Sequence, residues 1–552
     1  MASAKKTREM DSLPRRAKQQ YVVAMVIAAL LWAAFMVDIL YLRPGLLSMA
    51  QKAFGLLLAL AITYTQTTLR GEHRYYVEMA KAGCEPLPSF PNDLLGIRFL
   101  LDAARQIKSN TLLAGWSRLF DTLGHTYQHR IFPNPGVVIA TDEPENVRTV
   151  LVVRFDDWVI PQMRTRAFLP VLGRHSIFTT NGDEWRHSRA TLRPAFVRDQ
   201  VADLRCLDHH VAKMISHVPR DGQPFDLQAM LAMLTIDTIS DFMFGNSTDL
   251  LGTAPEDGLR FGRCFDLSMQ KIAHRARLGW LTLLRPDREL DECTSFINAY
   301  VEKYIANVKA ERDEKKGMGQ DSQGGKRYVF LNELLETGEP DEVIRDHLVS
   351  IFTAGRDTTT SVLSYLFFEL SRRPNVVEAI QREVEELNLR DMDQLPSWED
   401  LRNMKYLNWA VKEALRLNPP VATNGREAVR DTIIPRGGGP DGKSPVFVKK
   451  GTLLRYFPWA LHRRRNIYGD DADEFRPERW ETLRTTFEYV PFNAGPRICV
   501  GQQFALTQLA FVTFRILQAF RAIERRDDRP PIQKFGINTS MLHGCWVSMT
   551  PA

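Results

Sequence analysis

The sequence predicts a mainly α-helical catalytic domain with small β-sheets, placed behind an N-terminal membrane anchor. Residues 21–42 are apolar apart from Asp38, and this length suits a helix that spans a bilayer. Leu227–Phe244 and residues 341–373 carry long helical patterns. The strand-like runs are short and lie near glycine and proline, as around residues 437–440.

Composition narrows the class of protein. The 552 residues carry a net charge of +6 without a long basic tract, which argues against a nucleic-acid partner and fits an anionic membrane face or an acidic protein. The six cysteines are scattered without pairing or metal-ligand spacing, so we expect no disulfide framework and a domain in the cytosol. We predict an anchor over residues 1–70, a proline-containing hinge over 71–92 and one catalytic domain over 93–552.

The N-terminal region allows two membrane topologies. Residues 1–20 carry six basic side chains against two acidic ones. A second apolar stretch over residues 53–69 could form another span or lie in the membrane interface. One span with a cytosolic enzyme would place the basic residues on the lumenal side, against the positive-inside tendency. We favour a two-span hairpin, which keeps both ends cytosolic, and keep the single span as the alternative.

Several elements of the catalytic domain can be placed from pattern alone. Residues 200–310 are mostly helical by periodicity, and residues 311–326 have the charge and glycine content of a loop. A helix should follow Cys499 as far as about residue 520, before a β-like tail with a turn over residues 537–541. Strands are expected over residues 136–140, 150–153, 432–435 and 445–449.

The most specific pattern is Phe-x-x-Gly-x-Arg-x-Cys-x-Gly over residues 492–501, which an apolar helical run follows at once. Glycines let the backbone close around the Cys499 sulfur, and free N–H groups at the start of the helix favour a thiolate. A lone thiolate suits a haem iron better than a zinc ion, which takes four ligands. The alternative is a buried structural cysteine, although a chance match is expected only about once in several million windows.

A second pattern lies on a helix that starts near residue 181, with Asn181 or Asp183 as its cap. Trp185 and Arg189 stand four residues apart and therefore share one face of this helix. Taken alone, the pair is typical of a solvated amphipathic helix. With a haem nearby, the indole N–H and the guanidinium become donors to a propionate.

The long helix over residues 341–373 contains Ala-Gly-Arg-Asp-Thr-Thr at residues 354–359. Glycine and threonine are poor choices inside a buried helix, and a broken rule is expected where function imposes it. Gly355 would let a ligand approach, and a threonine hydroxyl would bond to the carbonyl one turn earlier. Asp357 and Thr358 would supply an acid and an alcohol for proton relay. The alternative is a polar patch between packed helices.

These motifs occur in order from about Gly96 to the C-terminus, and together they resemble the cytochrome P450 superfamily. The chain is most similar to the fungal membrane-bound hydroxylases of n-alkanes and fatty acids, in residues 185–194, 354–359, 435–442 and 497–503. The resemblance implies the cytochrome P450 fold, a triangular helical prism around haem b, with Cys499 as the axial ligand of the iron. Within the cysteine loop it also assigns Phe492, Gly495 and Gly501 to the haem site.

The resemblance assigns two further groups of residues. Four donors would anchor the haem propionates: Trp185, Arg189, Arg426 and Arg497. A buried structural triad would brace the cysteine loop from behind: Glu413, Arg416 and Arg479. Without the resemblance, Glu413 and Arg416 would be an ordinary pair on a helix surface, worth a few tenths of a kcal/mol.

The implied activity is insertion of one oxygen atom from O2 into a C–H bond of a lipophilic substrate, in terminal hydroxylation of n-alkanes or fatty acids. The one Gly-x-Gly-x-x-Gly match, at residues 437–442, lies between two expected strands and not before a helix, so it is no dinucleotide-binding motif. Electrons should therefore come from NADPH through a separate membrane-bound NADPH-cytochrome P450 reductase, with cytochrome b5 as a further partner. We expect the endoplasmic reticulum membrane as the location, with the catalytic domain facing the cytosol.

Three other functions remain open. Oxidation of a terpenoid or polyketide would use the same machinery, and Ala422 stands where relatives often carry a proline in a loop that faces substrate. A haem-thiolate isomerase or dehydratase would need no reductase, but it would have no use for Asp357 and Thr358. A haem-binding sensor or membrane receptor would also leave this pair unexplained.

Overall fold

The computed structural model describes residues 74–91, 96–131, 134–196, 204–278, 286–317 and 328–552. The predicted anchor, with its one or two spans, lies outside these residues. Within them, one helix is long and apolar enough to cross a membrane, α11 (Leu227–Phe244), and 72% of it is buried inside the protein. This helix is therefore part of the core.

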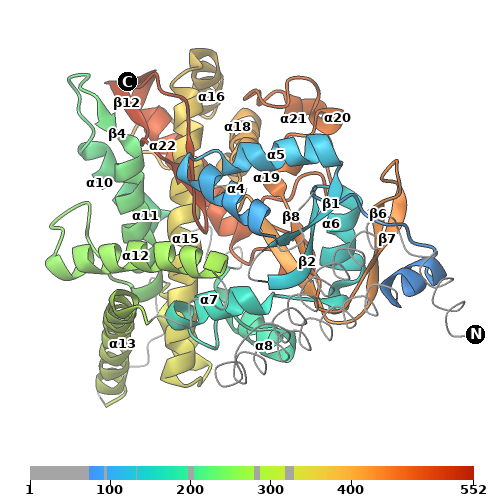
Figure 1. Ribbon diagram of the computed structural model, residues 1–552. Coiled ribbons are helices and arrows are strands. Elements are labelled where there is room, and N and C mark those ends of the chain that lie inside the picture. Colours follow the sequence, from blue (N-terminus) through green and yellow to red (C-terminus); the bar gives the residue numbers. More distant parts are fainter. Residues whose placement is uncertain (1–73, 92–95, 132–133, 197–203, 279–285, 318–327) are drawn as a thin grey trace, which may run out of the picture.

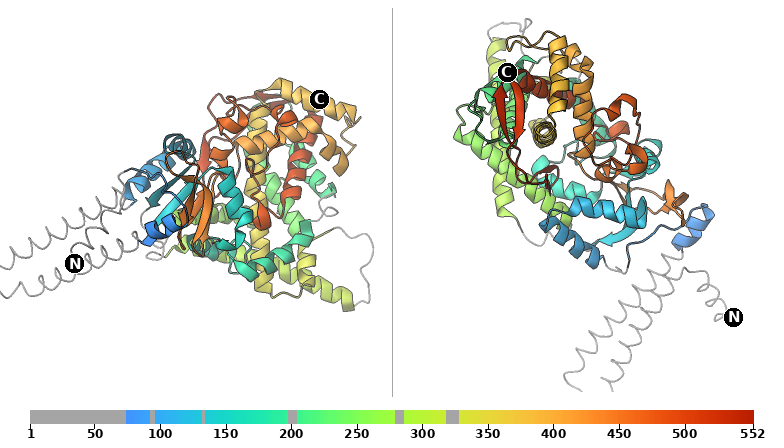
Figure 2. Two further views of the ribbon diagram at one scale, coloured as in Figure 1. Left: turned by 90° about the vertical axis from the view of Figure 1, so that its right-hand side faces the viewer. Right: turned by 90° about the horizontal axis from the view of Figure 1, so that it is seen from above.

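Helices make up most of the described chain, and α15 (Asp341–Leu370) runs through the middle of the helical part (Figures 1 and 2). The fold class predicted from the sequence is confirmed. The other helices are α4 (Ile97–Lys108), α5 (Leu112–Leu123), α6 (Pro144–Arg148), α7 (Gln162–Leu172), α8 (Gly182–Leu192), α10 (Arg205–Ser216), α12 (Glu256–Leu278), α13 (Arg288–Gly317), α14 (Phe330–Glu336), α16 (Pro374–Glu386), α17 (Trp398–Asn403), α18 (Lys405–Leu417), α19 (Pro458–Leu461), α20 (Arg465–Tyr468), α21 (Arg479–Thr482) and α22 (Gln502–Ala519).

The strands form four small sheets; β1, β2, β6, β7 and β8 lie on the right of Figure 1, whereas β4 and β12 lie near the C-terminus beside α10 and α22. The largest has the order β1-β2-β8-β5-β3, with β2 and β8 parallel and the other pairs antiparallel. Its strands are β1 (Thr126–Ile131), β2 (Asn134–Thr141), β3 (Trp158–Val159), β5 (Asn424–Ala428) and β8 (Leu453–Tyr456). The smaller sheets contain β6 (Thr432–Gly438) with β7 (Ser444–Val448), β10 (Gln533–Phe535) with β11 (Thr539–Met541), and β4 (Phe225–Asp226) with β12 (Trp546–Pro551) and β9 (Phe520–Arg525).

Part of the predicted hinge over residues 71–92 is attached to the sheets. The Glu85 N–H donates to the Pro445 carbonyl at 2.9 Å, and the Gln128 N–H donates to the Pro88 carbonyl at 2.8 Å. The Phe90 N–H donates back to the Gln128 carbonyl at 2.9 Å. The segment thus pairs with β1 and β7 before the chain enters α4.

Three predicted elements differ from the structure. Residues 150–153 form part of a π-helix (Thr149–Val153) rather than a strand. There the buried Val150 and Leu151 are followed by two exposed valines, a grouping that a two-residue strand period does not produce. The predicted loop over residues 311–326 begins later, because α13 continues to Gly317. The helix expected to reach residue 373 ends at Leu370, and Pro374 begins α16.

Packing around α15 positions the site. The helix α11 lies against α15, and a Cβ atom added to Gly355 would come within 2.9 Å of the Ile239 side chain on α11. The missing side chain of Gly355 thus lets two helices approach, and the expectation that it admits a ligand stays a prediction. The helix α22, which follows the cysteine loop, packs on α15 as well.

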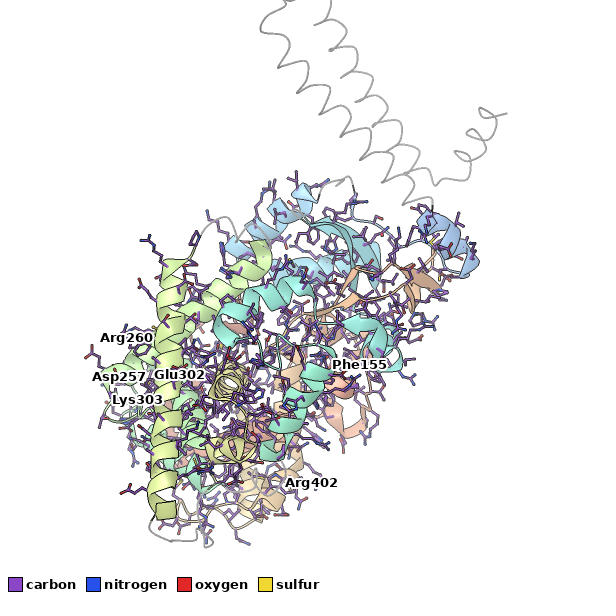
Figure 3. The ribbon with its side chains drawn as sticks, turned by 90° about the horizontal axis from the view of Figure 1, so that it is seen from below. Phe155, Asp257, Arg260, Glu302, Lys303 and Arg402 are labelled. Carbon is purple, nitrogen blue, oxygen red and sulfur yellow. The ribbon has the colours of Figure 1, made fainter. Side chains whose placement is uncertain are left out.

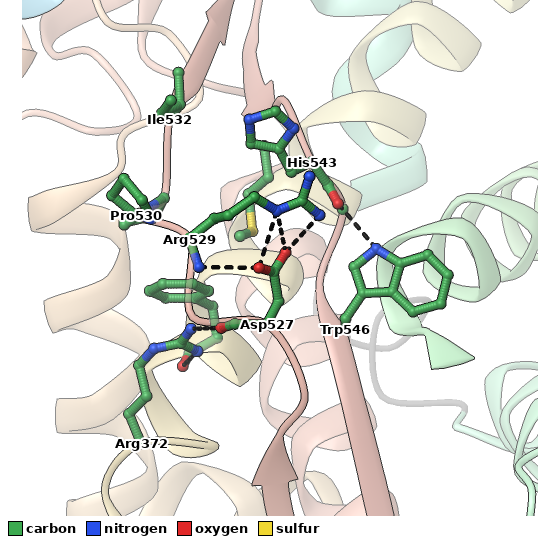
Figure 4. A pocket seen from close by; sticks show the side chains of 11 residues that line it. Arg372, Asp527, Arg529, Pro530, Ile532, His543 and Trp546 are labelled. Atoms are coloured by element: carbon green, nitrogen blue, oxygen red, sulfur yellow. Dashed lines mark hydrogen bonds and ion pairs between the residues drawn. The ribbon is translucent and has the colours of Figure 1, made fainter. Parts of the chain in front are cut away.

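A small pocket near the C-terminus is filled by its own polar partners (Figure 4). Arg529 holds the Asp527 carboxylate with its Nε and Nη2 atoms, at 2.9 and 2.7 Å. Arg372 donates to the Asp527 carbonyl at 2.6 Å, and the Trp546 indole donates to the His543 carbonyl at 3.0 Å. These bonds tie the C-terminal strands to the end of α15.

Candidate haem-thiolate site

The cysteine loop has a single shape set by its backbone. The Cys499 N–H donates to the Phe492 carbonyl at 2.9 Å. Asn493, at φ +66°, donates its side-chain amide to the Arg497 carbonyl at 3.1 Å. Gly495 lies at φ +67°, and a Cβ atom there would come within 2.1 Å of the Leu151 carbonyl oxygen. No other residue fits this position, which explains the glycine in the motif.

Cys499 alone is exposed among the six cysteines of the chain. Enough protein nevertheless surrounds the thiol for desolvation to raise its pKa. Two other effects lower the pKa of Cys499 and so oppose the effect of desolvation: a hydrogen bond from the Gly501 N–H and the positive charge of Arg189. Gly501 is the N-cap of α22, so the donor belongs to the start of the helix, where free N–H groups favour an anion. The site can thus hold a thiolate once a cation binds to it.

Arginines without acidic partners gather beside the loop. Arg497 donates to the Thr180 carbonyl at 3.0 Å and to the Asn181 side chain at 3.1 Å. Arg426 is buried and shares the Asn424 side-chain oxygen with Arg164, at 3.3 and 3.0 Å. Arg189 donates to the Ile498 carbonyl at 2.8 Å. Within the described residues, none of the four forms an ion pair with a carboxylate.

This cluster is electrostatically strained. Desolvation, followed by repulsion from Arg426, Arg164 and Arg189, lowers the pKa of Arg497 to about 9. Desolvation, followed by repulsion from Arg426, lowers the pKa of Arg164 to about 10. An anion bound among these guanidinium groups would relieve both their repulsion and the cost of their burial. Two propionates of a haem have the right charge, and the lone Cys499 thiol has the right chemistry for its iron.

Trp185 connects the cluster to the sequence motif. Its buried indole lies under the guanidinium of Arg497, with 4.2 Å from the guanidinium carbon to the ring centre, and Arg189 lies at 6.0 Å. Phe155 packs against the same indole, with 5.8 Å between ring centres. Figure 3 shows Phe155 on the side of the molecule opposite Glu302 and Lys303 of α13. Asn181 is the N-cap residue of α8, as expected, but its side chain bonds Arg497 and the Ile160 N–H instead of the helix.

Arg164 is the functional candidate that sequence reasoning missed. It lies on α7, three residues after Pro161, and nothing in its local sequence sets it apart from the other arginines. Its Nε atom is buried and has no hydrogen-bond partner within the described residues. Only the approach of β5, more than 250 residues later, reveals that it belongs with Arg426.

We predict that Arg164→Gln weakens haem retention roughly 10–100-fold, because a hydrogen bond to a charged group contributes about 1.5–3 kcal/mol. The measurement is the rate of haem transfer to an excess of apomyoglobin. The control is Arg166→Gln, which changes an exposed arginine on the same helix. An unchanged transfer rate in the Arg164 variant would remove this residue from the haem site.

The acid and alcohol of α15 lie in an uninterrupted α-helix. The Thr358 hydroxyl donates to the Ala354 carbonyl at 2.7 Å, which is the bond expected one turn earlier. Asp357 is half-buried, and its carboxylate lies 3.5 Å from Arg356, which also pairs with Asp266 at 2.6 Å. Desolvation raises the pKa of Asp357, and Arg356 lowers it in opposition. A carboxyl group with a raised pKa is suited to receive and release a proton.

Glu413, Arg416 and Arg479 contact one another in the core. Arg416 donates to both Glu413 oxygens at 2.8 and 2.9 Å, and Arg479 donates to one of them at 2.7 Å. The Trp480 indole donates to Glu413 at 2.9 Å. Arg416 also donates to the backbone carbonyls of His462 and Ala472, at 2.8 and 2.5 Å. The group therefore joins α18 to the chain that leads into the cysteine loop.

Comparison with known proteins assigns the part of the chain that contains this site to a family. The family model described as Cytochrome P450 matches residues 91–543. The cytochrome P450 monooxygenase himC of Aspergillus japonicus is 39% identical over 85% of this chain and 84% of its own length. The monooxygenase fsdH of Fusarium heterosporum is also 39% identical, over 85% of this chain and 84% of its own. Cytochrome P450 52A3-B of Candida maltosa is 35% identical over 89% of this chain and 95% of its own.

Proposed function

The chain belongs to the cytochrome P450 family of monooxygenases, and we propose that it hydroxylates the terminal carbon of n-alkanes or fatty acids. The observation that carries the haem chemistry is the Cys499 thiol beside four arginines that have no carboxylate partner in the described part of the chain. The substrate class is supported by the sequence resemblance to the fungal hydroxylases of these lipids. Relatives at 39% identity are named as monooxygenases without a substrate, so oxidation of a terpenoid or polyketide is the alternative.

The residues of this chain have separate roles in the proposed reaction. Cys499 would bind the haem iron as a thiolate, while Trp185, Arg189, Arg426 and Arg497 would hold the propionates together with Arg164. The bound haem supplies O2 activation and transfer of one oxygen atom to a C–H bond. The Gly501 N–H would temper the charge on the sulfur.

Proton delivery falls to α15. The Thr358 hydroxyl donates its one O–H to the Ala354 carbonyl, and it would turn away from that carbonyl to pass a proton. Asp357 would take the proton from solvent and supply Thr358, with Arg356 holding the carboxylate in place while Arg356 itself pairs with Asp266. Two positioned groups with exchangeable protons are the usual means of acid catalysis.

We predict that Thr358→Ala separates NADPH use from product formation. Proton delivery by a positioned side chain contributes about 10²–10⁴-fold to a rate, so hydroxylated product should fall about 100-fold while NADPH oxidation continues. The measurement is the ratio of product formed to NADPH consumed. Thr360→Ala is the matched control. The Thr360 hydroxyl also donates to a carbonyl one turn earlier, that of Arg356, but it lies against Thr235 of α11. Unchanged coupling in the Thr358 variant would exclude the hydroxyl from proton delivery.

Electrons would come from NADPH through a membrane-bound cytochrome P450 reductase, with cytochrome b5 as a further donor, at the endoplasmic reticulum membrane. Arg186 and Arg193 lie on and just after α8. Arg186 pairs with Asp183 and lies near Asp156, which lessens its attraction for an acidic partner. Arg193 is therefore the stronger candidate for contact with the reductase.

The direct test is turnover of full-length protein with the reductase and NADPH, using hexadecane, hexadecanoic acid and a terpenoid. The expected product from the first two is the terminal alcohol, identified by mass spectrometry. If only the terpenoid gives a product, the proposed substrate class changes from a linear lipid to a terpenoid or polyketide. Turnover of an organic peroxide to a rearranged product, without NADPH dependence, would support the isomerase or dehydratase instead.

A further inference from the structure

A second pair of arginines lies on the other face of the five-stranded sheet. Tyr456 of β8 faces the haem-side arginines and donates its hydroxyl to Asn493 at 2.8 Å. Its neighbour Arg455 must face the opposite way, because successive strand residues alternate. On that face Arg455 is in register with Ala140 of β2, which is in register with Tyr127 of β1. The helix α5 covers this side of the sheet (Figure 1).

Aromatic rings separate Arg455 from a second arginine, Arg277, near the end of α12. The guanidinium carbon of Arg455 lies 5.8 Å from the Trp116 ring centre. Trp116 lies 5.1 Å from Phe535 of β10, and the Arg277 guanidinium lies 5.5 Å from the same phenylalanine. Arg277 donates one hydrogen bond, to the Phe535 carbonyl at 2.9 Å. Two cations thus flank an aromatic pair.

Within the described residues, neither Arg455 nor Arg277 forms an ion pair with a carboxylate. The Arg455 side chain also donates no hydrogen bond to any described residue. Desolvation lowers the pKa of both arginines, and Arg277 lowers that of Arg455 further. The nearest ionisable neighbours do not neutralise them. Tyr127 is protonated, because burial raises its pKa, and His129 is neutral, because burial and then Arg455 lower its pKa to about 3. Half-buried guanidinium groups in this state are costly unless an anion joins them.

Unpartnered polar groups point to the same missing ligand. The Tyr127 hydroxyl is buried without a hydrogen-bond partner, on a side chain that is 0% exposed. Both ring nitrogens of His129 are also buried without a partner. Such groups are rare in native proteins and call for a specific partner. A carboxylate next to Arg455 would accept from Tyr127 as well.

We propose that Arg455 and Arg277 bind the carboxylate of a long-chain fatty acid substrate, with Tyr127 as an additional donor. Guanidinium groups bind carboxylates with two hydrogen bonds, and the half-buried Phe535 offers apolar surface to the methylene chain. The β10–β11 hairpin connects this pair to the haem side, since Phe535 lies on β10 and β11 packs on α15, the helix of Thr358. The proposal rests on the proposed function and makes the acid, rather than the alkane, the preferred substrate.

This binding mode would determine which carbon atom is hydroxylated. A substrate held by its carboxylate at Arg455 presents its far end to the iron, so the distal methyl group is the atom attacked. An alkane or a methyl ester has no charge for this pair and should bind more weakly and in more registers. The two arginine clusters are kept apart by the sheet itself, so the haem propionates and the substrate carboxylate do not compete.

The experiment is a spectral titration of the full-length haem protein with hexadecanoic acid, methyl hexadecanoate and hexadecane. The wild type should bind the acid at least 10-fold more tightly than the ester. Arg455→Gln and Arg277→Gln should each weaken acid binding roughly 10–100-fold, as removal of hydrogen bonds to a charged group does, and leave ester binding unchanged. Arg455→Lys should recover part of the affinity. Arg118→Gln, which removes an exposed arginine of α5, is the control.

Tyr127→Phe provides a second variant that preserves the core volume if an arginine variant fails to fold. It should weaken acid binding less than Arg455→Gln does and shift part of the product from the terminal to neighbouring carbons. Equal affinity of the wild type for acid and ester, or acid binding that no variant changes, would overturn the proposal.

A second measurement separates this proposal from the proposed function. Equilibrium dialysis with labelled hexadecanoic acid detects binding without turnover. Arginine-dependent binding of the acid without hydroxylation would contradict the proposed function and leave the carboxylate site standing. Terminal hydroxylation of acid, ester and alkane with equal affinities would contradict the carboxylate site and leave the proposed function standing.

Discussion

Cys499→Ala is expected to abolish thiolate ligation of the haem and to lower monooxygenase turnover by more than 100-fold. Partners that only touch a metal ligand typically contribute about 10–100-fold to metal affinity or activity, so loss of the ligand itself should cost more. No other cysteine can replace it, because the remaining five are buried or half-buried at other places in the fold. The measurement is the absorption spectrum of the reduced, carbon monoxide-bound protein, whose red-shifted Soret band reports a thiolate ligand.

The matched control is Cys293→Ala, which removes a half-buried thiol on α13. It should keep the wild-type spectrum and activity. A Cys499→Ala protein with an unchanged Soret band and full turnover would overturn the assignment of the iron ligand and the mechanism built on it.

Glu413→Gln is expected to destabilise the domain by about 3–5 kcal/mol, which is the cost of removing one member of a buried ion pair. The side chains of Glu413 and Arg416 are 0% exposed, so the two arginines left behind cannot be solvated in place. A whole domain is stable by only about 5–15 kcal/mol, and much of the variant should therefore be recovered unfolded or without haem. The measurement is the midpoint of urea unfolding, followed by tryptophan fluorescence together with haem absorbance.

Glu481→Gln serves as the control, because it changes an exposed carboxylate on α21, the same short helix as Arg479. Its unfolding midpoint should match that of the wild type. If Glu413→Gln also unfolds at the wild-type midpoint, the triad does not brace the cysteine loop.

The sequence predicted those parts of the site whose geometry depends on residues close together in one motif. The cysteine loop is such a case, because its positive φ values and the bond from the Cys499 N–H to the Phe492 carbonyl depend on residues within ten positions of one another. The triad needed the resemblance, since Glu413 and Arg479 lie 66 residues apart. The fold class followed from long helical periods, which tertiary packing does not reverse.

The remainder depended on contacts between distant segments. Arg164 joins Arg426 only when α7 meets β5, and no local pattern marks it. The contact of Gly355 with Ile239 of α11 was not predicted, because a glycine inside a helix has the same sequence signature whether it faces a ligand or another helix. Residues 150–153 are β-branched or apolar, but their burial follows a helix, so local propensity was overridden by packing.

The most direct test of the proposed function is a substrate-binding difference spectrum of the purified haem protein without reductase, recorded with alkanes, fatty acids and terpenoids. A ligand that displaces water from the iron converts it from low to high spin. We predict this shift with long-chain lipids, and most tightly with the fatty acids. A shift with ring compounds alone would contradict terminal hydroxylation and assign the enzyme to the oxidation of a terpenoid or polyketide.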